Sequence, residues 1–564
     1  MRSKLLLLLG AGLAICVAAA PSLALADHGS GDHGRHGKAS KHVLLISVDG
    51  LHASDLRKWT AAYPNSTLAK LSARGTTYNN ALTTLPSDSS PGMTALATGG
   101  TPKTTGIYYD DSYDRSLYAP QNKTCSGPAG SETFYAEPVD YDQTKLNGGV
   151  SAHNGASVDP NHVPRRKTAT GCEPVLPNQF LRVNTIFDVI HNAGLRTAWS
   201  DKHPSYQMLN GPQPNAIDDL YTSEINSIAD PSIPGPSGGD WTSSEPRVVA
   251  YDSLKVKAVV DEINGQSSYC VDEPGKCSSP GTPAIMGMNF QAVSVGEKLP
   301  DPNSPVSPLD GLPYIGGEAA PGSSHPFNAN LQNGLQFVDD ALGQMVQALR
   351  NRGLLDSTEI IITAKHGQSP VNPNKLTRAN PDDFNAVVKS STGAQFPDPT
   401  TGLNQQASTT TDDVGIIWLS TPFQDKTQGM LAAFQTPTNY HKFDIRTIIS
   451  GDRLKRQFGD PASDPRTPDA IVLPNEGGLY SLSSKKIAEH GGGSHDDRNV
   501  ALLVVNPKHE NGGRSEDAPV TTTQVAPTIL QYLDLNPEAL DAVRIEGTQA
   551  LPAGQNGGGE QGHN

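Results

Sequence analysis

Two apolar segments of this chain end in residues that bind metal ions, although they lie in opposite halves of the sequence. Residues 41–48 run into Asp49 and Gly50, and residues 359–364 run into Lys365, His366 and Gly367. Continuous Val, Ile and Leu runs are typical of buried parallel strands. Ligands of open α/β sheets bind beyond the carboxyl ends of such strands. We therefore expect the two strand ends to meet in one metal-dependent hydrolase site.

Strand-like and helix-like segments alternate around these two ends. Residues 184–194 have the apolar spacing of a helix that stops at a glycine, and residues 284–290 read as another buried strand. The clearest helix spans residues 330–352 and leads into the strand at 359, while residues 499–507 supply the strand that closes the sheet. This alternation predicts an α/β fold, a mostly parallel central sheet with helices on both faces and loop-rich insertions.

Both ends of the chain are expected to lie outside this fold. Residues 1–26 combine a basic start, an apolar stretch and small residues at a cleavage point, as in a secretory signal peptide. The apolar stretch is shorter than the ~20 residues of a membrane-spanning helix. Residues 27–41 and 554–564 are interpreted as a flexible leader and a disordered tail. The catalytic domain is assigned to residues 42–540 of a secreted or periplasmic protein, with no membrane attachment after cleavage of the signal.

The cysteines indicate two local disulfides. Cys16 leaves with the signal, and the other four enter a compartment where disulfides persist. Of the three possible connectivities, Cys125 with Cys172 and Cys270 with Cys277 is favoured, and the alternative of a zinc cluster lacks the usual Cys-x-x-Cys spacing.

The first pair lies in a polar stretch, residues 108–177, that we interpret as an insertion. A second insertion is expected at residues 370–485, with a strand at 413–420 and a helix at 427–434.

The charge of the chain limits its partners. A formal net charge of −15 argues against a basic surface for nucleic acids. If the substrate is a small phosphate or sulfate ester, local cations must overcome this acidic field, and bound metal ions are a natural supply. The sequence leaves the oligomeric state open.

Five motifs occur in the order that is typical of the alkaline phosphatase superfamily. They are the Val-Asp-Gly strand end at Asp49, residues 86–99 with their Ala-Thr-Gly turn, the His-Gly strand end at His366, the His-Gly-Gly at His490, and the closing residues 522–530. Within that superfamily the chain most resembles the type I phosphodiesterase/nucleotide pyrophosphatase branch, over most of residues 42–536. The resemblance implies an alkaline-phosphatase-like fold and a hydrolase of phosphoesters or phosphodiesters.

The resemblance also implies a nucleophile and a metal site. Asp49 corresponds to the first metal ligand, although a lone Asp-Gly more often caps a turn. Ser89 falls at the nucleophile position, at an expected helix start that offers backbone N–H groups to a phosphoryl oxygen. Ser90 is its competitor, and an ordinary helix cap is the structural alternative. Asp49, Ser89, His366 and His490 would bind one or two divalent ions, zinc being expected, and Ser89 would form a covalent seryl intermediate.

Two residues depart from the pattern of that branch. Asp110 stands where nucleotide-cleaving members have an Asn that holds the phosphoryl oxygen, and a carboxylate there repels phosphate unless it is protonated or metal-bound. Lys365 replaces an Asp ligand, so the usual two-zinc site is not expected. Either one metal remains on Asp49, His366 and Ser89, or the Lys365 ammonium neutralises a bound oxyanion, as one metal plus lysine does in sulfatases. Lys365 and Asp110 are therefore expected to join Ser89 as catalytic residues.

The ligands of a second ion are less defined. His490 matches the late histidine ligand of the branch, with His495 as a nearby competitor. The Asp-x-x-x-His pair that completes the second metal site is not recognisable after Met288. Candidate substitutes are Asn289, Gln291 and Glu297, and strand-end position alone adds Lys202 and His203.

Three functions follow from these patterns. The leading hypothesis is a secreted metal-dependent hydrolase of phosphoesters or phosphodiesters. The second keeps the fold and cleaves sulfate or phosphonate groups. The third is a catalytically silent extracellular binding module, which Lys365 and the missing ligand pair would explain.

Overall fold

The computed structural model describes residues 41–134, 139–299, 326–397, 405–483, 488–507 and 512–552. The expected signal peptide, the tail at 554–564 and all of the leader except Lys41 lie outside these ranges. Lys41 forms an ion pair with Asp534. The folded region continues past residue 540, because α16 (Asp541–Glu546) contributes Ala542 and Val543 to the main core.

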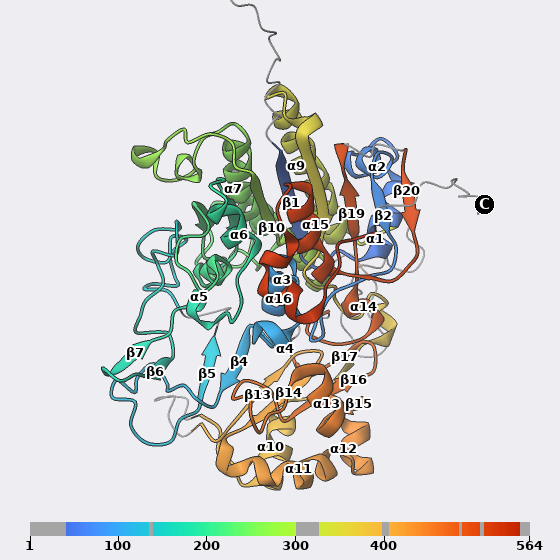
Figure 1. The fold of residues 1–564 in the computed structure, drawn as a ribbon. Helices are drawn as coiled ribbons and strands as arrows, with labels where there is room; N and C mark the ends of the chain where they lie inside the picture. Colours follow the sequence, from blue (N-terminus) through green and yellow to red (C-terminus); the bar gives the residue numbers. More distant parts are fainter. Residues whose placement is uncertain are drawn as a thin grey trace, which may run out of the picture. The chain divides into compact units, whose positions relative to one another are not determined.

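An eight-stranded sheet carries the strand ends that the sequence singled out, in the order β20-β2-β19-β11-β1-β10-β8-β9. Figure 1 labels β20, β2, β19, β1 and β10 of this sheet. Five neighbouring strands run parallel: β11 (Thr358–Thr363), β1 (His42–Val48), β10 (Ile285–Phe290), β8 (Ala198–Asp201) and β9 (Asp219–Thr222). The strand β19 (Leu502–Val505) is antiparallel to both of its neighbours, β11 and β2 (Thr76–Tyr78), and β20 (Arg514–Glu516) is parallel to β2. The predicted mostly parallel sheet is confirmed, but β19 lies inside the sheet and does not close it.

Helices cover both faces of this sheet, because successive side chains of a strand point to opposite sides. Val43 and Leu45 of β1 share a core with α3 (Ser89–Thr98), α6 (Ile186–Asn192) and α15 (Val525–Tyr532). Leu44, Ile46 and Val48 share another with α1 (Ala53–Ala62), α2 (Thr67–Ser72), α7 (Glu245–Ile263) and α9 (Ala329–Asn351). All five side chains are fully buried, as expected for a strand between two helical layers.

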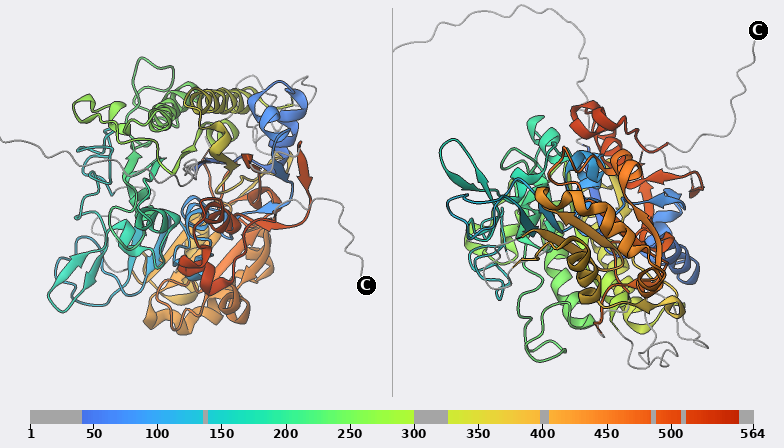
Figure 2. Two further views of the ribbon diagram at one scale, coloured as in Figure 1. Left: turned by 45° about the horizontal axis from the view of Figure 1, so that its top comes forward. Right: turned by 90° about the horizontal axis from the view of Figure 1, so that it is seen from below.

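A second, antiparallel sheet forms within residues 370–485, in the order β13-β14-β16-β15 (Figures 1 and 2). Its strands are β13 (Ala407–Thr411), β14 (Gly415–Leu419), β15 (Ile445–Ile449) and β16 (Ala470–Pro474). One face packs on α10 (Pro381–Thr392) and α11 (Thr427–Phe434), so the predicted strand at 413–420 and helix at 427–434 are both present. The other face packs on Tyr108, Tyr109 and Tyr113, which follow α3 and α4 (Pro102–Thr105). The second sheet therefore lies against the segment that follows the candidate nucleophile.

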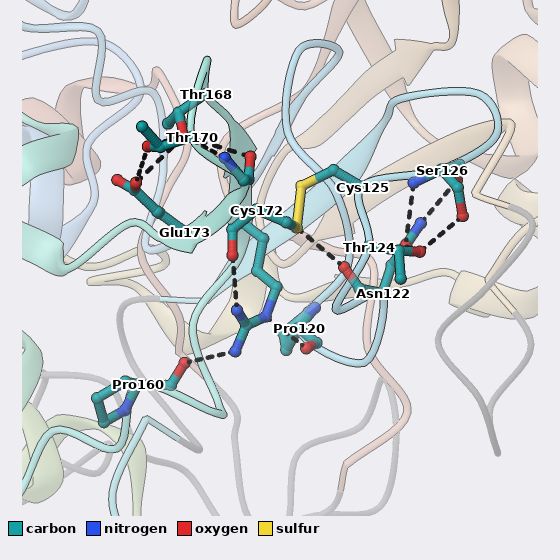
Figure 3. Close-up of a disulfide and its surroundings, with 12 residues drawn as sticks. Pro120, Asn122, Thr124, Cys125, Ser126, Pro160, Thr168, Thr170, Cys172 and Glu173 are labelled. Atoms are coloured by element: carbon teal, nitrogen blue, oxygen red, sulfur yellow. Dashed lines mark hydrogen bonds between the residues drawn. A yellow bond between two sulfur atoms is a disulfide. The ribbon is translucent and has the colours of Figure 1, made fainter.

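Residues 108–177 consist largely of turns and loops, with two short ladders. One pairs β4 (Asp111–Asp114) with β5 (Ser131–Phe134), and the other pairs β6 (Arg165–Lys167) with β7 (Cys172–Pro174). A disulfide joins Cys125 to Cys172 across this region, with Cα atoms 5.4 Å apart (Figure 3). A second joins Cys270 to Cys277. Both predicted pairings are confirmed.

The described helices include none with the length and apolar character needed to cross a bilayer.

Candidate active site

The carboxyl ends of four parallel strands meet the first turn of α3. Ser89 is the first residue of that helix, and Asp49 directly follows β1. The ends of the other strands add Lys202 after β8, Gln291 after β10, and Lys365 and His366 after β11. Distant segments thus supply one cluster, which is the assembly expected at the carboxyl edge of a parallel sheet.

Ser89 is held at a capped helix start. Asp88 is the N-cap residue, and its carboxylate accepts a hydrogen bond from the backbone N–H of Ser90 at 3.1 Å. Ser89 Oγ lies 3.3 Å from His366 Nε2 and accepts a hydrogen bond from Lys202 Nζ at 3.0 Å. The cap is therefore Asp88, and the Ser89 hydroxyl faces the strand ends.

Asp49 is surrounded by cations and amides. Its Oδ2 lies 3.5 Å from His366 Nε2, 3.4 Å from Lys365 Nζ and 3.5 Å from Lys202 Nζ. Gln291 Nε2 donates to the same oxygen, and the Asn289 amide, oriented to satisfy its hydrogen bonds, donates to Oδ1 at 2.8 Å. Burial alone would raise the pKa of Asp49, but Lys365, His366 and Lys202 outweigh it and hold that pKa well below its usual range. Asp49 is therefore a carboxylate.

The two lysines differ in their electrostatic surroundings. Lys365 is fully buried, and its Nζ donates to the hydroxyl of Tyr206 at 2.8 Å; burial lowers its pKa to about 8. Burial also opposes the charge of Lys202, yet Asp49 and Asp110 raise the pKa of Lys202 above its usual value. Lys202 is therefore a stable cation in contact with the Ser89 hydroxyl.

Asp110 lies beside this cluster. Its backbone N–H donates to Asp88 Oδ2 at 2.9 Å, which places it next to the start of α3. Its carboxylate is one of the charges that raise the pKa of Lys202. A carboxylate that faces a lysine repels a phosphate less than an isolated one.

His490 lies behind His366, and the two rings are 4.0 Å apart between centroids. His490 Nδ1 is 3.2 Å from Asp88 Oδ1, and burial lowers the pKa of His490 well below its usual value. His490 thus contacts Asp88 and His366, while Asp49 and Ser89 each contact His366 Nε2. His495, the competing histidine, is exposed at the start of α14 (His495–Arg498).

The donor atoms fit one divalent ion. Ser89 Oγ and Asp49 Oδ2 lie 3.3 Å and 3.5 Å from His366 Nε2. Neighbouring ligands of a tetrahedral ion with bonds of about 2.0–2.2 Å have similar separations. Of the three substitutes for a second ligand pair, Asn289 and Gln291 bind Asp49, whereas Glu297 lies against His52.

Sequence reasoning missed some neighbours of the site. Asp201, whose Oδ1 is 3.9 Å from Lys365 Nζ, ends β8, so the strand-end rule that pointed to Lys202 extends to it. Tyr206 lies in a 3₁₀ segment (Pro204–Asn210) that no motif marks. His203, the other strand-end candidate, pairs with Glu224 at 2.9 Å and does not join the cluster through that contact.

A family model described as type I phosphodiesterase / nucleotide pyrophosphatase matches residues 43–218 and 320–496. Two structures of murine ectonucleotide pyrophosphatase / phosphodiesterase 5, one of them an inactive variant in complex with AMP, are similar to this chain. Each is 12% identical and has a TM-score of 0.49, with 88% of this chain and 96% of that chain covered. No curated protein matches the chain by sequence.

The family match extends over more than half of the chain and includes Asp49, Ser89, His366 and His490. The chain therefore belongs to the type I phosphodiesterase / nucleotide pyrophosphatase family and is a phosphodiesterase-type hydrolase of ester bonds.

Proposed function

We propose that the protein is an exported phosphodiesterase in which Ser89 attacks phosphorus and forms a covalent seryl intermediate. The observation that carries the proposal is the contact of Ser89 Oγ with both His366 Nε2 and Lys202 Nζ, at 3.3 Å and 3.0 Å. Asp49, Ser89 and His366 would hold one divalent ion, zinc by the chemistry of the donors, with His490 beside them as a further candidate ligand. The two disulfides favour an oxidising, extracytoplasmic location.

In the proposed reaction, the Ser89 hydroxyl loses its proton to solvent, and Oγ bonds to phosphorus while the bond from phosphorus to the leaving oxygen breaks. Water then cleaves the bond between phosphorus and Oγ and restores the hydroxyl. A divalent ion bound at Asp49, Ser89 and His366 would lower the pKa of the hydroxyl and of the attacking water. Lys202 Nζ, which already donates to Oγ, stabilises the alkoxide form of Ser89.

Lys365 takes over part of the charge that a second metal ion supplies in the two-metal arrangement. Its ammonium is fully buried and lies 3.4 Å from Asp49. A cation fixed in a low-dielectric site stabilises a developing phosphoryl charge more strongly than one in water. Because one metal plus lysine also serves sulfatases, an aryl sulfate is the second substrate class to compare with an aryl phosphodiester. We expect the higher kcat/KM for the phosphodiester, and the reverse order would move the proposal to sulfate esters.

The test of the nucleophile is Ser89→Ala with Ser90→Ala as its matched control. Both serines lie in the first turn of α3 and are equally buried, at 1% exposure. Hydrolysis of bis(p-nitrophenyl) phosphate should fall by at least about 10³-fold in Ser89→Ala, with unchanged thermal unfolding, and should persist in Ser90→Ala. Full activity of Ser89→Ala would discard the assignment.

A further inference from the structure

A second group of ligand-type side chains lies next to the active site, at His52, Asp55 and Glu297. His52 precedes α1, Asp55 lies in the first turn of α1, and Glu297 belongs to α8 (Ala292–Lys298), which follows β10. Each residue offers a nitrogen or oxygen atom within 4.8 Å of those of the other two. Their exposed fractions are 3%, 0% and 1%. These three side chains are called the triad below. Two come from the start of α1, which follows β1 and Asp49, and the third comes from α8, which follows β10, a neighbour of β1 in the sheet.

Helix capping explains only part of the triad. Asp55 Oδ2 accepts a hydrogen bond from the backbone N–H of His52 at 3.2 Å and lies 2.7 Å from His52 Nδ1. Asp55 Oδ1 and both oxygens of Glu297 have no hydrogen-bond partner among the described residues. Buried carboxylates with unsatisfied oxygens are costly unless a cation or a proton compensates them. A single imidazolium balances only one of the two carboxylates, and burial raises the pKa of the other, Glu297, to about 8, so in the absence of an ion a proton compensates it.

The orientation of His52 suits a ligand role. Its Nε2 lies 2.8 Å from the carbonyl oxygen and 3.1 Å from the amide nitrogen of Gln368, so the backbone alone positions this side of the ring. The Gln368 N–H donates to Nε2, so in the absence of an ion Nδ1 carries a proton and donates it to Asp55. A metal ion would replace this proton and bind the Nδ1 lone pair, which faces Asp55 at 2.7 Å and Glu297 at 3.3 Å, while Nε2 would donate to the Gln368 carbonyl oxygen at 2.8 Å. Metal-binding histidines are commonly oriented by such a backbone carbonyl.

We propose that the triad binds a divalent transition-metal ion of the zinc class through His52 Nδ1 and the carboxylates of Asp55 and Glu297. A nitrogen donor with two carboxylates suits zinc or manganese, whereas calcium and magnesium prefer oxygen ligands alone. None of the three residues belongs to the donor set at Asp49, so each site has its own ligands and can be removed by its own substitution. The inference therefore does not depend on the proposed function.

The position of the triad indicates a structural role for this ion. A Cβ atom on Gly50, which follows Asp49, would lie 2.6 Å from Glu297 Oε2. Gln368, which contacts His52, is two residues past His366. An ion at the triad would thus fix the strand ends that carry Asp49 and His366 relative to α1 and α8.

Metal content measured on the full chain tests the proposal. After loading with zinc and exhaustive dialysis, Glu297→Gln should hold about one ion per chain fewer than the wild type, and so should Asp49→Asn. The double variant should lose both ions. Glu359→Gln is the matched control, because Glu359 is also a buried glutamate but binds Asn506 at 2.8 Å, so its zinc content should not change.

The outcomes separate the two sites. Wild-type zinc content in Glu297→Gln would overturn the triad site, whatever Asp49→Asn does. Unchanged zinc in Asp49→Asn alone would count against the catalytic ion and not against the triad. If Glu297→Gln fails to fold, anomalous scattering from zinc-loaded wild-type crystals decides: we expect a peak within about 2.3 Å of His52 Nδ1, and no peak there would overturn the proposal.

Discussion

Lys202 and Lys365 place two ammonium groups within 3.5 Å and 3.4 Å of Asp49 Oδ2. Only Lys202 also contacts the Ser89 hydroxyl, at 3.0 Å. We therefore propose different roles for the two cations: Lys202 acts on the Ser89 hydroxyl, and Lys365 balances the charge of Asp49.

Removal of the Lys202 charge should slow the reaction without unfolding the protein. We expect Lys202→Met to lower kcat for an aryl phosphodiester by about 10²–10³-fold, the usual effect of deleting one preorganised donor at a reacting oxygen. Lys298→Met is the control, since Lys298 is similarly shielded, with 17% side-chain exposure against 12% for Lys202, but pairs with Glu489. Equal losses in both variants would show that Lys202 has no specific role.

At the residue scale, motifs located most of the cluster but not its electrostatics. The order of five motifs was sufficient to single out Asp49, Ser89 and His366, which the structure brings together. The pairing of His490 with Asp88, and of Glu297 with His52 and Asp55, could not be predicted. These contacts join segments that are remote in sequence, and no local pattern encodes which side of a strand end a helix will cover.

The helix α3 packs directly onto the end of β11. A Cβ atom on Gly92 would lie 2.0 Å from the backbone oxygen of Lys365, so only glycine allows this approach. Gly92 is one turn past Ser89 in the same helix. The spacing between α3 and β11 thus sets the distance between the Ser89 hydroxyl and the His366 ring.

Gly92→Ala should separate α3 from β11. We expect a loss of about 1–3 kcal/mol in the free energy of unfolding from overpacking, together with reduced hydrolysis because Ser89 moves away from His366. Gly429→Ala is the control in α11, where the nearest atom to an added Cβ is 3.9 Å away, and it should stabilise by about 0.5–1 kcal/mol. Denaturant unfolding measures both. A Gly92→Ala protein as stable and active as the wild type would contradict this packing account.

We expect Asp140 to make the stability of the fold depend on pH. Burial and the neighbouring Glu224 raise the pKa of Asp140 from 3.8 to about 8. Between these values the folded chain keeps a proton that the unfolded chain has lost. The stabilisation linked to this proton is complete below about pH 4 and is lost as the pH rises through about 8.

Asp140→Asn should remove this pH dependence, because the amide does not titrate. At pH 9 we expect the variant to be more stable than the wild type by at least about 1 kcal/mol, and the difference should shrink toward pH 4. Thermal unfolding across this pH range measures it. A constant difference between the two proteins at all pH values would show that Asp140 does not carry the titration.

At the element scale, periodicity predicted the long elements and missed the short ones. The helix expected at 330–352 is α9, and the strands expected at 41–48 and 284–290 are β1 and β10. The predicted place of β19 at the edge of the sheet was wrong, because an apolar run does not reveal which strands will pair with it. Its partner β2 and the edge strand β20 have three residues each, too few for an alternating pattern to be recognised.

For the whole molecule, the two disulfides close loops of very different length. Cys125 and Cys172 are 47 positions apart, and Cys270 and Cys277 are 7 apart. In the chain-entropy picture, the longer loop should stabilise the fold by about 1.7 kcal/mol more than the shorter one. Replacing each pair by serines and comparing the free energies of unfolding tests this expectation. A larger loss for the Cys270–Cys277 pair would contradict it.

Mass spectrometry of the protein, quenched in acid while it turns over an aryl phosphodiester, tests the nucleophile most directly. The tryptic peptide of residues 75–103 should carry the phosphoryl adduct, and fragmentation should place it on Ser89. An adduct on a different residue, or steady turnover by the wild type with this peptide unmodified under conditions that trap the intermediate, would contradict the proposed mechanism.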